Sequence, residues 1–369
     1  MANPIIVVAS VLKPVDDVRL YEKFALSLGQ TNKYDINIIG FSTKNTPFQY
    51  NIKYFPIFNF RRMSIHRVLA PINYWICLRK LQPDLIIVTT AELLPVSCIY
   101  KMLFRCKVIY DVQENHYRNI IYNNHYAFLF KWFLALSVRG LESILKYSVD
   151  YIIYAERCYE QELRFTSRNY SILENKYKPI KSASVGTSTS IRNFLYSGTI
   201  NENYGIFEAI AVFRALYELD DTLHLTIIGH CSYKPTLIKL KNLVKESKNI
   251  QLVSGEEPVA HDQIVDQILH SDLGIIAYRS NPSTKNCIPT RMYEYLALQL
   301  PMIIPHNPAW EKICNHYKAA ISIDFLNNHP AELMETINQY NFYPQGIDDQ
   351  VVWKKEEHQL LEIIDSVLS

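Results

Sequence analysis

Arg291 and Glu294 stand near the start of residues 289–305, a segment whose pattern predicts a helix followed by a short apolar strand. Pro289 suits the first position of a helix, where a missing N–H costs nothing. The N–H groups of a first helical turn can bind an anion, and a carboxylate one turn further can accept hydrogen bonds from vicinal hydroxyls. The segment can therefore hold a nucleoside diphosphate, with Thr290 and Arg291 at the phosphates and Glu294 at the ribose. The same spacing also fits an ordinary amphipathic helix with a solvated Glu294.

A second place for phosphate is the loop from Gly198 to Gly205, which follows an apolar run. Gly205 stands where a helical pattern begins, so a phosphate can approach the backbone there and the helix dipole favours its charge. A plain strand-to-helix turn would use glycine equally well. Ser254 and Gly255 follow another β-rich run, and they fit either a loop that lines a binding pocket or a strand-end turn.

Polar side chains also follow the apolar run 107–110 in the first half of the chain. Asp111, Gln113 and Glu114 stand where this predicted strand ends, and ligands of open α/β sheets bind beyond the carboxyl ends of the strands. The two carboxylates could instead cap the helix that follows.

Arg19 opens a predicted helix near the N-terminus. It could meet a phosphate, or it could form a surface ion pair with Asp16 or Glu22, which is a common and weak interaction.

The elements that must position these residues alternate along the chain. Short apolar runs are separated by longer helical patterns, which indicates parallel sheets covered by helices on both faces. This alternation predicts a doubly wound α/β architecture. The runs in the first half are residues 35–41, 84–89, 107–110, 151–154 and 171–173.

The texture changes to small polar residues near residues 181–190, which predicts a linker between two domains. We therefore expect an N-terminal doubly wound domain over residues 1–180, a linker over 181–192 and a second doubly wound domain over 193–350. A last helix, within residues 351–369, is expected to pack back on the first domain.

Taken in order, these segments resemble retaining glycosyltransferases of the GT-B fold, in the large family 4 group. Residues 289–305 resemble the donor-binding signature, residues 107–115 the fourth strand and its loop, and residues 194–205 the strand–loop–helix that opens the C-terminal domain. Residues 225–229, 253–255 and 272–278 follow in the expected order. The resemblance covers nearly the whole chain and implies two Rossmann-like domains that face a central cleft. The N-terminal domain, residues 1–180, would be the acceptor side, and the C-terminal domain, residues 193–350, would bind the nucleotide sugar.

The resemblance implies transfer of a sugar from a nucleotide-diphosphate sugar to a hydroxyl of a glycan or lipid-linked glycan. The resemblance also implies that the anomeric configuration is retained and that no metal is essential. It further implies a role in surface polysaccharide or glycan biosynthesis. The sugar and the reacting centre would meet Gln113, Asn286, Asp111 and Glu114. The donor nucleotide and diphosphate would be held by Gly198, Thr199, Gly205, Ser254, Gly255, Thr290, Arg291 and Glu294.

The chain departs from the family pattern at four of these places. Thr199 and Tyr204 stand where basic residues clamp the diphosphate, Asn286 replaces a glutamate, and Gln113 replaces a histidine. Arg291 could supply part of the missing charge. The departures leave two alternatives open, which are a non-catalytic GT-B scaffold or partner subunit and a nucleotide-sugar epimerase.

The composition is that of a folded globular protein and excludes few classes of function. The 369 residues are 49% hydrophobic and 20% charged, which is typical of globular proteins large enough for two domains. The net charge of +2 names no partner, and no basic run or zinc spacing indicates nucleic acid. Seven scattered cysteines without C-x-x-C spacing predict reduced thiols in a cytoplasm. We expect neither a signal peptide nor a transmembrane helix.

Basic and aromatic residues mix in three segments, which suits an anionic membrane surface. They are residues 61–67, residues 101–107 and residues 126–136, the last with Lys131 inside it. We expect membrane contact at residues 61–67. We expect residues 126–136 to form a helix buried in the first domain, with Lys131 snorkelling to the surface. The localisation that follows is cytoplasmic, with peripheral contact at the inner face of the plasma membrane.

Overall fold

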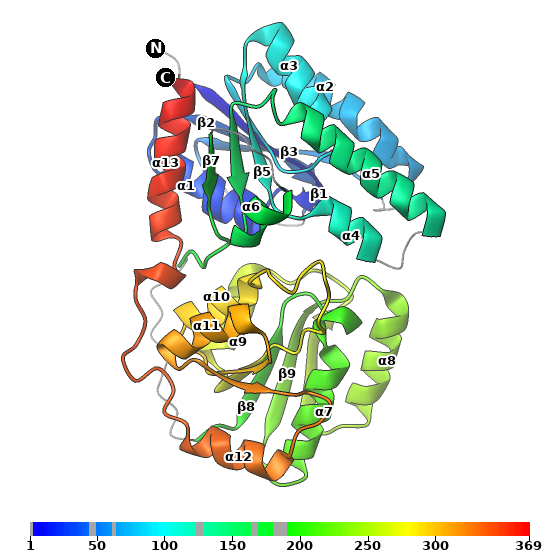
Figure 1. The fold of residues 1–369 in the computed structure, drawn as a ribbon, viewed down its shortest axis with the longest axis vertical. Helices are drawn as coiled ribbons and strands as arrows, with labels where there is room; N and C mark the ends of the chain where they lie inside the picture. The colour runs from blue at the N-terminus through cyan, green and yellow to red at the C-terminus, as the bar shows by residue number, and fades with distance from the viewer. Residues whose placement is uncertain (1–2, 44–48, 61–63, 123–127, 164–168, 180–189) are drawn as a thin grey trace. The chain divides into compact units, whose positions relative to one another are not determined.

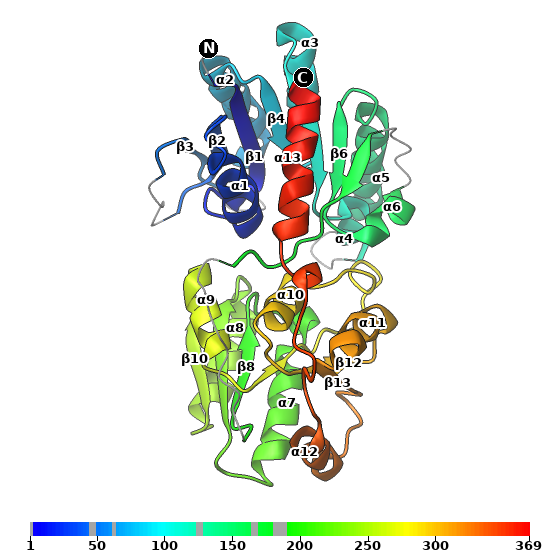
Figure 2. The same cartoon turned by 90° about the vertical axis from the view of Figure 1, so that its left-hand side faces the viewer.

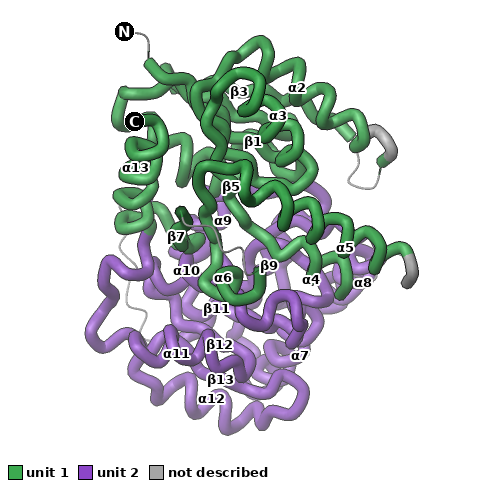
Figure 3. The backbone as a smooth tube through the Cα atoms, turned by 45° about the horizontal axis from the view of Figure 1, so that its top comes forward, with its two compact units in different colours: residues 1–178, 353–369 green, residues 179–352 purple. Residues whose placement is uncertain are grey.

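The computed structural model describes residues 3–43, 49–60, 64–122, 128–163, 169–179 and 190–369. Two compact units make up the chain (Figure 3). The first holds residues 1–178 and 353–369, and the second holds residues 179–352. Each unit is built on its own parallel sheet.

The first unit contains a seven-stranded sheet in the order β3-β2-β1-β4-β5-β6-β7, and every pair of neighbours is parallel. Its central strands are continuous apolar runs, as strands under two layers of helix must be. In register, Val8 lies between Ile38 and Ile87. The strands are β1 (Ile5–Pro14), β2 (Asp35–Phe41), β3 (Ile52–Phe58), β4 (Leu85–Val88), β5 (Lys107–Val112), β6 (Tyr151–Tyr154) and β7 (Tyr170–Ile172).

Helices cover both faces of this sheet. They are η1, a π-helix (Val18–Ala25), α1 (Leu26–Gly29), the short 3-10 helix η2 (Ile65–Leu69), α2 (Ala70–Leu81), α3 (Leu94–Phe104), α4 (His116–Tyr122), α5 (Phe128–Leu145), α6 (Arg157–Leu163) and α13 (Lys354–Leu368). Figures 1 and 2 show α1 and α13 along one side of the sheet and α2, α3 and α5 along the other.

The C-terminal helix α13 belongs to the first unit, although the second unit precedes it in the chain. Trp353, which is fully buried, donates from its backbone N to Tyr177 O at 2.7 Å and from Nε1 to Ser27 Oγ at 3.2 Å. Lys176 and Glu356 form an ion pair beside it at 2.6 Å. Side chains of α13 thus complete the hydrophobic core on that face of the sheet.

The second unit contains a six-stranded sheet in the order β10-β9-β8-β11-β12-β13, again parallel throughout. The strands are β8 (Asn193–Ser197), β9 (His224–His230), β10 (Ile250–Gly255), β11 (Leu273–Ile275), β12 (Met302–Pro305) and β13 (Ala320–Ile323). The order reverses at β8, which has β9 on one side and β11 on the other. Such a switch point leaves a crevice at the carboxyl ends of the strands.

Helices alternate with these strands, and α7, α8 and α12 share one hydrophobic core with them. The helical elements are η3, a 3-10 turn (Glu202–Tyr204), α7 (Ile206–Tyr217), α8 (Lys234–Lys245), α9 (His261–Leu269), α10 (Thr290–Ala297), α11 (Pro308–Tyr317), α12 (Pro330–Gln339) and η4, a 3-10 turn (Asp349–Val351). The predicted fold class, α/β with two doubly wound domains, is confirmed. Most of the predicted linker 181–192 lies outside the described residues.

One expectation about burial is wrong. Residues 126–136 were expected inside the first domain, yet on α5 the side chains of Phe130, Phe133 and Leu136 are 54%, 69% and 59% exposed. The helix buries the small Ala135 and partly buries Leu134 and Val138, whereas Phe130, Phe133 and Leu136 point outward. Hydrophobicity alone could not fix this phase, because both faces of the helix are apolar.

The basic segment 61–67 was expected at a membrane, but most of its side chains lie outside the described residues. Arg67 is described, and it forms an ion pair with Glu92. The membrane expectation at this segment stays a prediction.

Candidate functional site

The helix expected at residues 289–305 is α10, and Pro289 is its N-cap residue. A proline cap has no side-chain acceptor, and no side-chain cap bond is made to this first turn. The backbone amides of Thr290 and Arg291 belong to this turn. Its geometry is the one that an anion-binding helix start requires.

The Arg291 side chain runs from this turn to the loop after β8. Its NH2 donates to Thr199 O at 3.1 Å. It also lies so close to Gly198 that a Cβ there would come within 2.9 Å of it. Arg291 is 5% exposed, and its NH1 finds no hydrogen-bond partner among the described residues. A buried cation with an unused donor is therefore placed directly behind the predicted phosphate loop.

Aromatic rings surround this guanidinium. Its central carbon lies 4.9 Å from the ring centroid of Tyr196 and 5.3 Å from that of Tyr278. Burial acts to lower the pKa of Arg291, but the nearby tyrosines raise that pKa overall, so the side chain stays charged. Burial raises the pKa of Tyr196 and of Tyr278, so both rings are neutral phenols.

The loop itself needs its two glycines. Gly198 and Gly205 have φ of +88° and +73°, which L side chains rarely adopt. A Cβ on Gly205 would also lie 1.7 Å from Ala277 O. Gly205 thus lets the start of α7 pass against the segment that follows β11, which supports the strand-to-helix turn. Its own N–H is used within this turn, where it donates to Glu202 O at 3.0 Å.

Tyr204 stands at one of the positions where a basic clamp residue was missing. Its ring stacks on Tyr278 at 4.5 Å between centroids and 16° between planes, and its carbonyl accepts from Tyr196 at 3.1 Å. The second such position is Thr199, whose carbonyl is bound by Arg291 while its side chain is exposed. Both positions hold the loop in shape rather than supply charge.

Glu294 has a partner that sequence reasoning missed. Its Oε1 lies 3.1 Å from Nε2 of His261, the first residue of α9, and both side chains are largely buried. Ser254 and Gly255 end β10 and begin the connection to that helix. Ser254 adopts a φ of +68°, and its Oγ donates to Glu257 O at 2.8 Å. The Ser254 hydroxyl therefore closes the turn, which was the alternative interpretation of this residue.

Asn286 is exposed on the loop that leads to α10. This loop is tied to α11, because Trp310 Nε1 donates to Cys287 O at 2.8 Å and Asn307 Nδ2 donates to Lys285 O at 2.9 Å. Its contact with a sugar stays a prediction.

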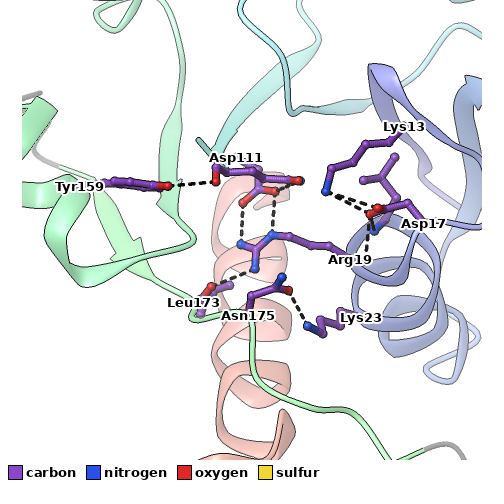
Figure 4. A network of polar contacts seen from close by, with 10 residues as sticks. Lys13, Asp17, Arg19, Lys23, Asp111, Tyr159, Leu173 and Asn175 are labelled. Atoms are coloured by element: carbon purple, nitrogen blue, oxygen red, sulfur yellow. Dashed lines mark hydrogen bonds and ion pairs between the residues drawn. The ribbon is translucent and has the colours of Figure 1, made fainter. Parts of the chain in front are cut away.

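In the first unit, Asp111 has an intramolecular partner for both carboxylate oxygens (Figure 4). Arg19 donates from Nε and NH2 at 2.9 and 2.7 Å, and from NH1 to Leu173 O at 3.0 Å. Arg19 and Asp111 are 1% and 0% exposed. Of the two alternatives left open for Arg19, the structure contains an ion pair, but the partner is Asp111 and not Asp16 or Glu22. The start of η1 and the end of β5 bring together two residues that are distant in sequence.

Gln113 extends this network, since its Nε2 donates to Asp111 Oδ2 at 2.6 Å. Its Oε1 is buried without a hydrogen-bond partner among the described residues. Glu114 accepts from the side chain of Asn119 at 2.9 Å. The expectation that Asp111 or Glu114 caps the next helix is wrong, because Asn115 Oδ1 accepts from the amide of Arg118 at 3.2 Å.

Metal-binding and membrane-spanning features are both absent from the part of the chain that the structure describes. Its residues contain no group of three His, Cys, Asp or Glu side chains that could hold a metal ion. Within the same residues, no helix has the length and apolar character needed to cross a membrane.

Solved structures with this arrangement cover the whole chain. Sucrose-phosphate synthase from Thermosynechococcus elongatus superimposes with a TM-score of 0.73 at 11% identity, over 99% of each chain. HepE from Anabaena, in complex with UDP and glucose, gives 0.67 at 12% identity over 99% of this chain and 100% of that one. AviGT4, a glycosyltransferase involved in avilamycin A biosynthesis, gives 0.62 at 9% identity over 99% and 98%. The chain has the GT-B fold. No family model and no curated protein matches the sequence.

Within this GT-B chain, the predicted residues fall into two groups. In the second unit, Gly198, Thr199 and Arg291 lie together at the switch point. In the first unit, Asp111 and Gln113 lie together at the end of β5. Sequence reasoning missed Tyr278, although a residue at the end of β11 could have been suspected from its place alone.

Proposed function

We propose that the protein is a glycosyltransferase that uses a nucleotide-diphosphate sugar as donor. The observation that carries this proposal is the buried Arg291, whose NH2 binds the Thr199 carbonyl beside Gly198 while its NH1 has no hydrogen-bond partner among the described residues. Oriented donors that exist before the substrate arrives stabilise the charge of a leaving diphosphate effectively. HepE, one of the structural neighbours, forms a complex with UDP-glucose, which supports a donor of this class.

In this proposal each predicted residue has a role. Arg291, with the amides of Thr290 and of the Gly198–Gly205 loop, holds the diphosphate. Glu294, fixed by His261 at 3.1 Å, accepts hydrogen bonds from the ribose. Ser254 and Gly255 line the base. Asn286 and Gln113 contact the sugar.

We propose that the acceptor is a hydroxyl of a glycan or lipid-linked glycan and that configuration is retained. The work of the protein is then to hold the two substrates in a reactive geometry and to stabilise the leaving group, without an essential metal. A role in surface polysaccharide or glycan biosynthesis follows from that acceptor class. All seven cysteines are free, which supports a reducing, cytoplasmic setting, with the acceptor presented at an anionic membrane surface.

A second candidate is a non-catalytic GT-B scaffold or partner subunit, which transfers no sugar. It is favoured by the structural use of Thr199 and Tyr204, which shape the loop and bring no charge. A nucleotide-sugar epimerase is the remaining alternative, and it differs by acting on the donor alone.

Thermal unfolding with a panel of nucleoside diphosphates and nucleotide sugars tests the donor site, because a ligand of the folded state raises the melting temperature by mass action. The stabilising donor is then incubated with and without glycan acceptors, and the products are identified by NMR. Sugar transfer with a retained anomeric centre supports the proposal. Stabilisation without turnover indicates a binding protein, and conversion without acceptor indicates an epimerase. No stabilisation by any nucleotide contradicts the transferase and the epimerase and favours the scaffold.

A further inference from the structure

The solvent side of α5 carries a stripe of large apolar side chains. Phe130, Phe133 and Leu136 are followed eight residues later by Ile144, which is 71% exposed. Their spacings of three, three and eight residues put them on one side of the helix. A surface helix ordinarily turns such a stripe toward the core, so this outward stripe requires another explanation.

The neighbouring helices continue the same surface. On α3, Ile99, Met102 and Leu103 are 45%, 71% and 62% exposed, again at helical spacing. On α2, Ile72 and Ile76 are 55% and 49% exposed. These three helices are neighbours on one side of the sheet (Figure 1). The exposed side chains of α2, α3 and α5 are called here the outer helix face.

The charges of these helices have one sign. Basic residues are distributed over all three, namely Arg79, Lys80, Lys101, Lys131 and Arg139. The acidic residue of the three helices is Glu142, which is 1% exposed and binds the hydroxyl of Tyr110 at 2.7 Å. Among these five, Lys101 is paired at 2.7 Å with Asp150, which lies after α5. Over the described ranges of α2, α3 and α5 themselves, no carboxylate reaches the surface.

Apolar side chains with a basic surround and without acidic ones fit an anionic bilayer. The apolar side chains can enter the headgroup boundary while Lys and Arg contact lipid phosphates. A second copy of the chain fits poorly, because a two-fold interface sets each surface against itself. The basic face would then meet the basic face of the copy, without a surface carboxylate on α2, α3 or α5 to compensate it.

We propose that the outer helix face of the first unit docks on an anionic lipid surface, with α2, α3 and α5 lying along it. This inference sharpens the proposed membrane association and names its surface, but it does not depend on the donor site. It moves the contact from residues 61–67, where the sequence placed it, to three helices of the fold.

The test is flotation of the full chain with vesicles of phosphatidylcholine alone and with an equal mixture of phosphatidylcholine and phosphatidylglycerol. We expect recovery with the anionic vesicles at low salt and loss of recovery at high salt, because salt screens the phosphate contacts. Absence of flotation, or equal recovery with both vesicle types, would overturn the proposal.

The charge variant is Arg79→Gln with Lys80→Gln. Each basic residue near such a surface raises affinity about fivefold, so the pair should lower vesicle affinity roughly thirtyfold. The matched control is Lys239→Gln with Lys245→Gln on α8. Lys239 lies 4.0 Å from the Phe207 ring, as Arg79 lies 4.3 Å from the Phe104 ring. Equal losses in both variants would show unspecific attraction and contradict the outer helix face.

The apolar variant is Phe133→Ser with Ile144→Ser, at positions 69% and 71% exposed. We expect a loss on the order of tenfold in vesicle affinity, because these side chains leave water on binding. The control is Ile238→Ser with Leu326→Ser, at 61% and 80% exposed in the second unit, and it should bind as the unchanged protein does. A concentration-dependent dimer that Phe133→Ser dissociates would instead identify a second copy as the occupant.

Each variant is also measured without vesicles. Since the replaced side chains are exposed, the melting temperature and the affinity for the best nucleotide should not change. Lost flotation with intact nucleotide binding isolates the membrane surface, whereas absent nucleotide binding with intact flotation contradicts the donor site alone.

Discussion

Two arginines, one in each unit, are buried at the carboxyl ends of central strands, and their partners differ. Arg19 is held by both carboxylate oxygens of Asp111. Arg291 has a backbone carbonyl and two tyrosine rings, and its NH1 has no partner among the described residues. A buried charge is expensive unless it is paired. The first arginine is therefore complete within the fold, while the second keeps a donor for the proposed diphosphate.

The largest expected effect is a loss of stability when the Arg19–Asp111 pair is broken. Asp111→Ala leaves Arg19 buried and unpaired, and it should lower the free energy of unfolding by about 3–5 kcal/mol. Urea unfolding followed by circular dichroism measures this. The double variant Arg19→Met with Asp111→Leu removes both charges and should recover much of the loss. A loss for Asp111→Ala of under about 1 kcal/mol would mean that the pair does not contribute as the structure implies.

The opposite result is expected for Arg291→Met. Because Arg291 has no carboxylate partner among the described residues, the ligand-free protein should lose much less stability than it does with Asp111→Ala. Affinity for a nucleoside diphosphate should fall by about 1.5–3 kcal/mol, which is the contribution of a charged hydrogen bond, while affinity for the nucleoside should hardly change. Isothermal titration calorimetry with both ligands separates the two effects.

The control for this variant is Arg214→Met, in the same unit. Arg214 donates to a backbone carbonyl, Leu243 O, at 3.1 Å, the distance from Arg291 to Thr199 O. It should leave both affinities unchanged. Equal losses of diphosphate and nucleoside affinity in Arg291→Met would show that Arg291 only shapes the loop.

Glu294→Ala tests the proposed ribose contact, as Arg291→Met tests the proposed diphosphate contact. If Glu294 holds the ribose, nucleoside and nucleotide should lose affinity alike, by about 1.5 kcal/mol, or roughly tenfold. This is the lower end of the range for a charged acceptor, because His261 already engages the carboxylate. Glu294→Gln should lose less. Unchanged affinity in a protein that does bind nucleotides would remove Glu294 from the site.

Local features of these sites could be predicted from the sequence. Pro289 at a helix start and Gly205 before α7 depend on backbone preferences of neighbouring residues, and both lie where the pattern placed them. The apolar runs form parallel strands as predicted, because the pattern that specifies a strand also lies in neighbouring residues. A helix start or a buried strand is specified within a few residues of chain.

The partners of the two arginines could not be predicted in this way. Arg19 is 92 positions from Asp111, and Arg291 is 92 positions from Thr199. Which of several carboxylates meets an arginine depends on which strand ends are adjacent, and therefore on the strand order. The exposure of the large side chains of α5 could not be predicted for another reason. Phe133 and Ala135 are both apolar, so hydrophobicity gave no face to choose.

The smallest expected effect is a gain in affinity for a nucleoside diphosphate. Thr199 is exposed at its side chain, and Arg291 binds its carbonyl, so Thr199→Arg should keep the loop and add a cation beside it. An exposed charge contributes about 0.5–1 kcal/mol and is screened by salt. Affinity for a nucleoside diphosphate should thus rise roughly threefold at low salt and return to the original value at high salt, as measured by calorimetry. Thr199→Gln, a long uncharged side chain, is the control and should give no gain. If Thr199→Arg gains nothing at low salt while Arg291→Met still loses affinity, the diphosphate lies on the α10 side of Arg291 and away from the Thr199 side chain.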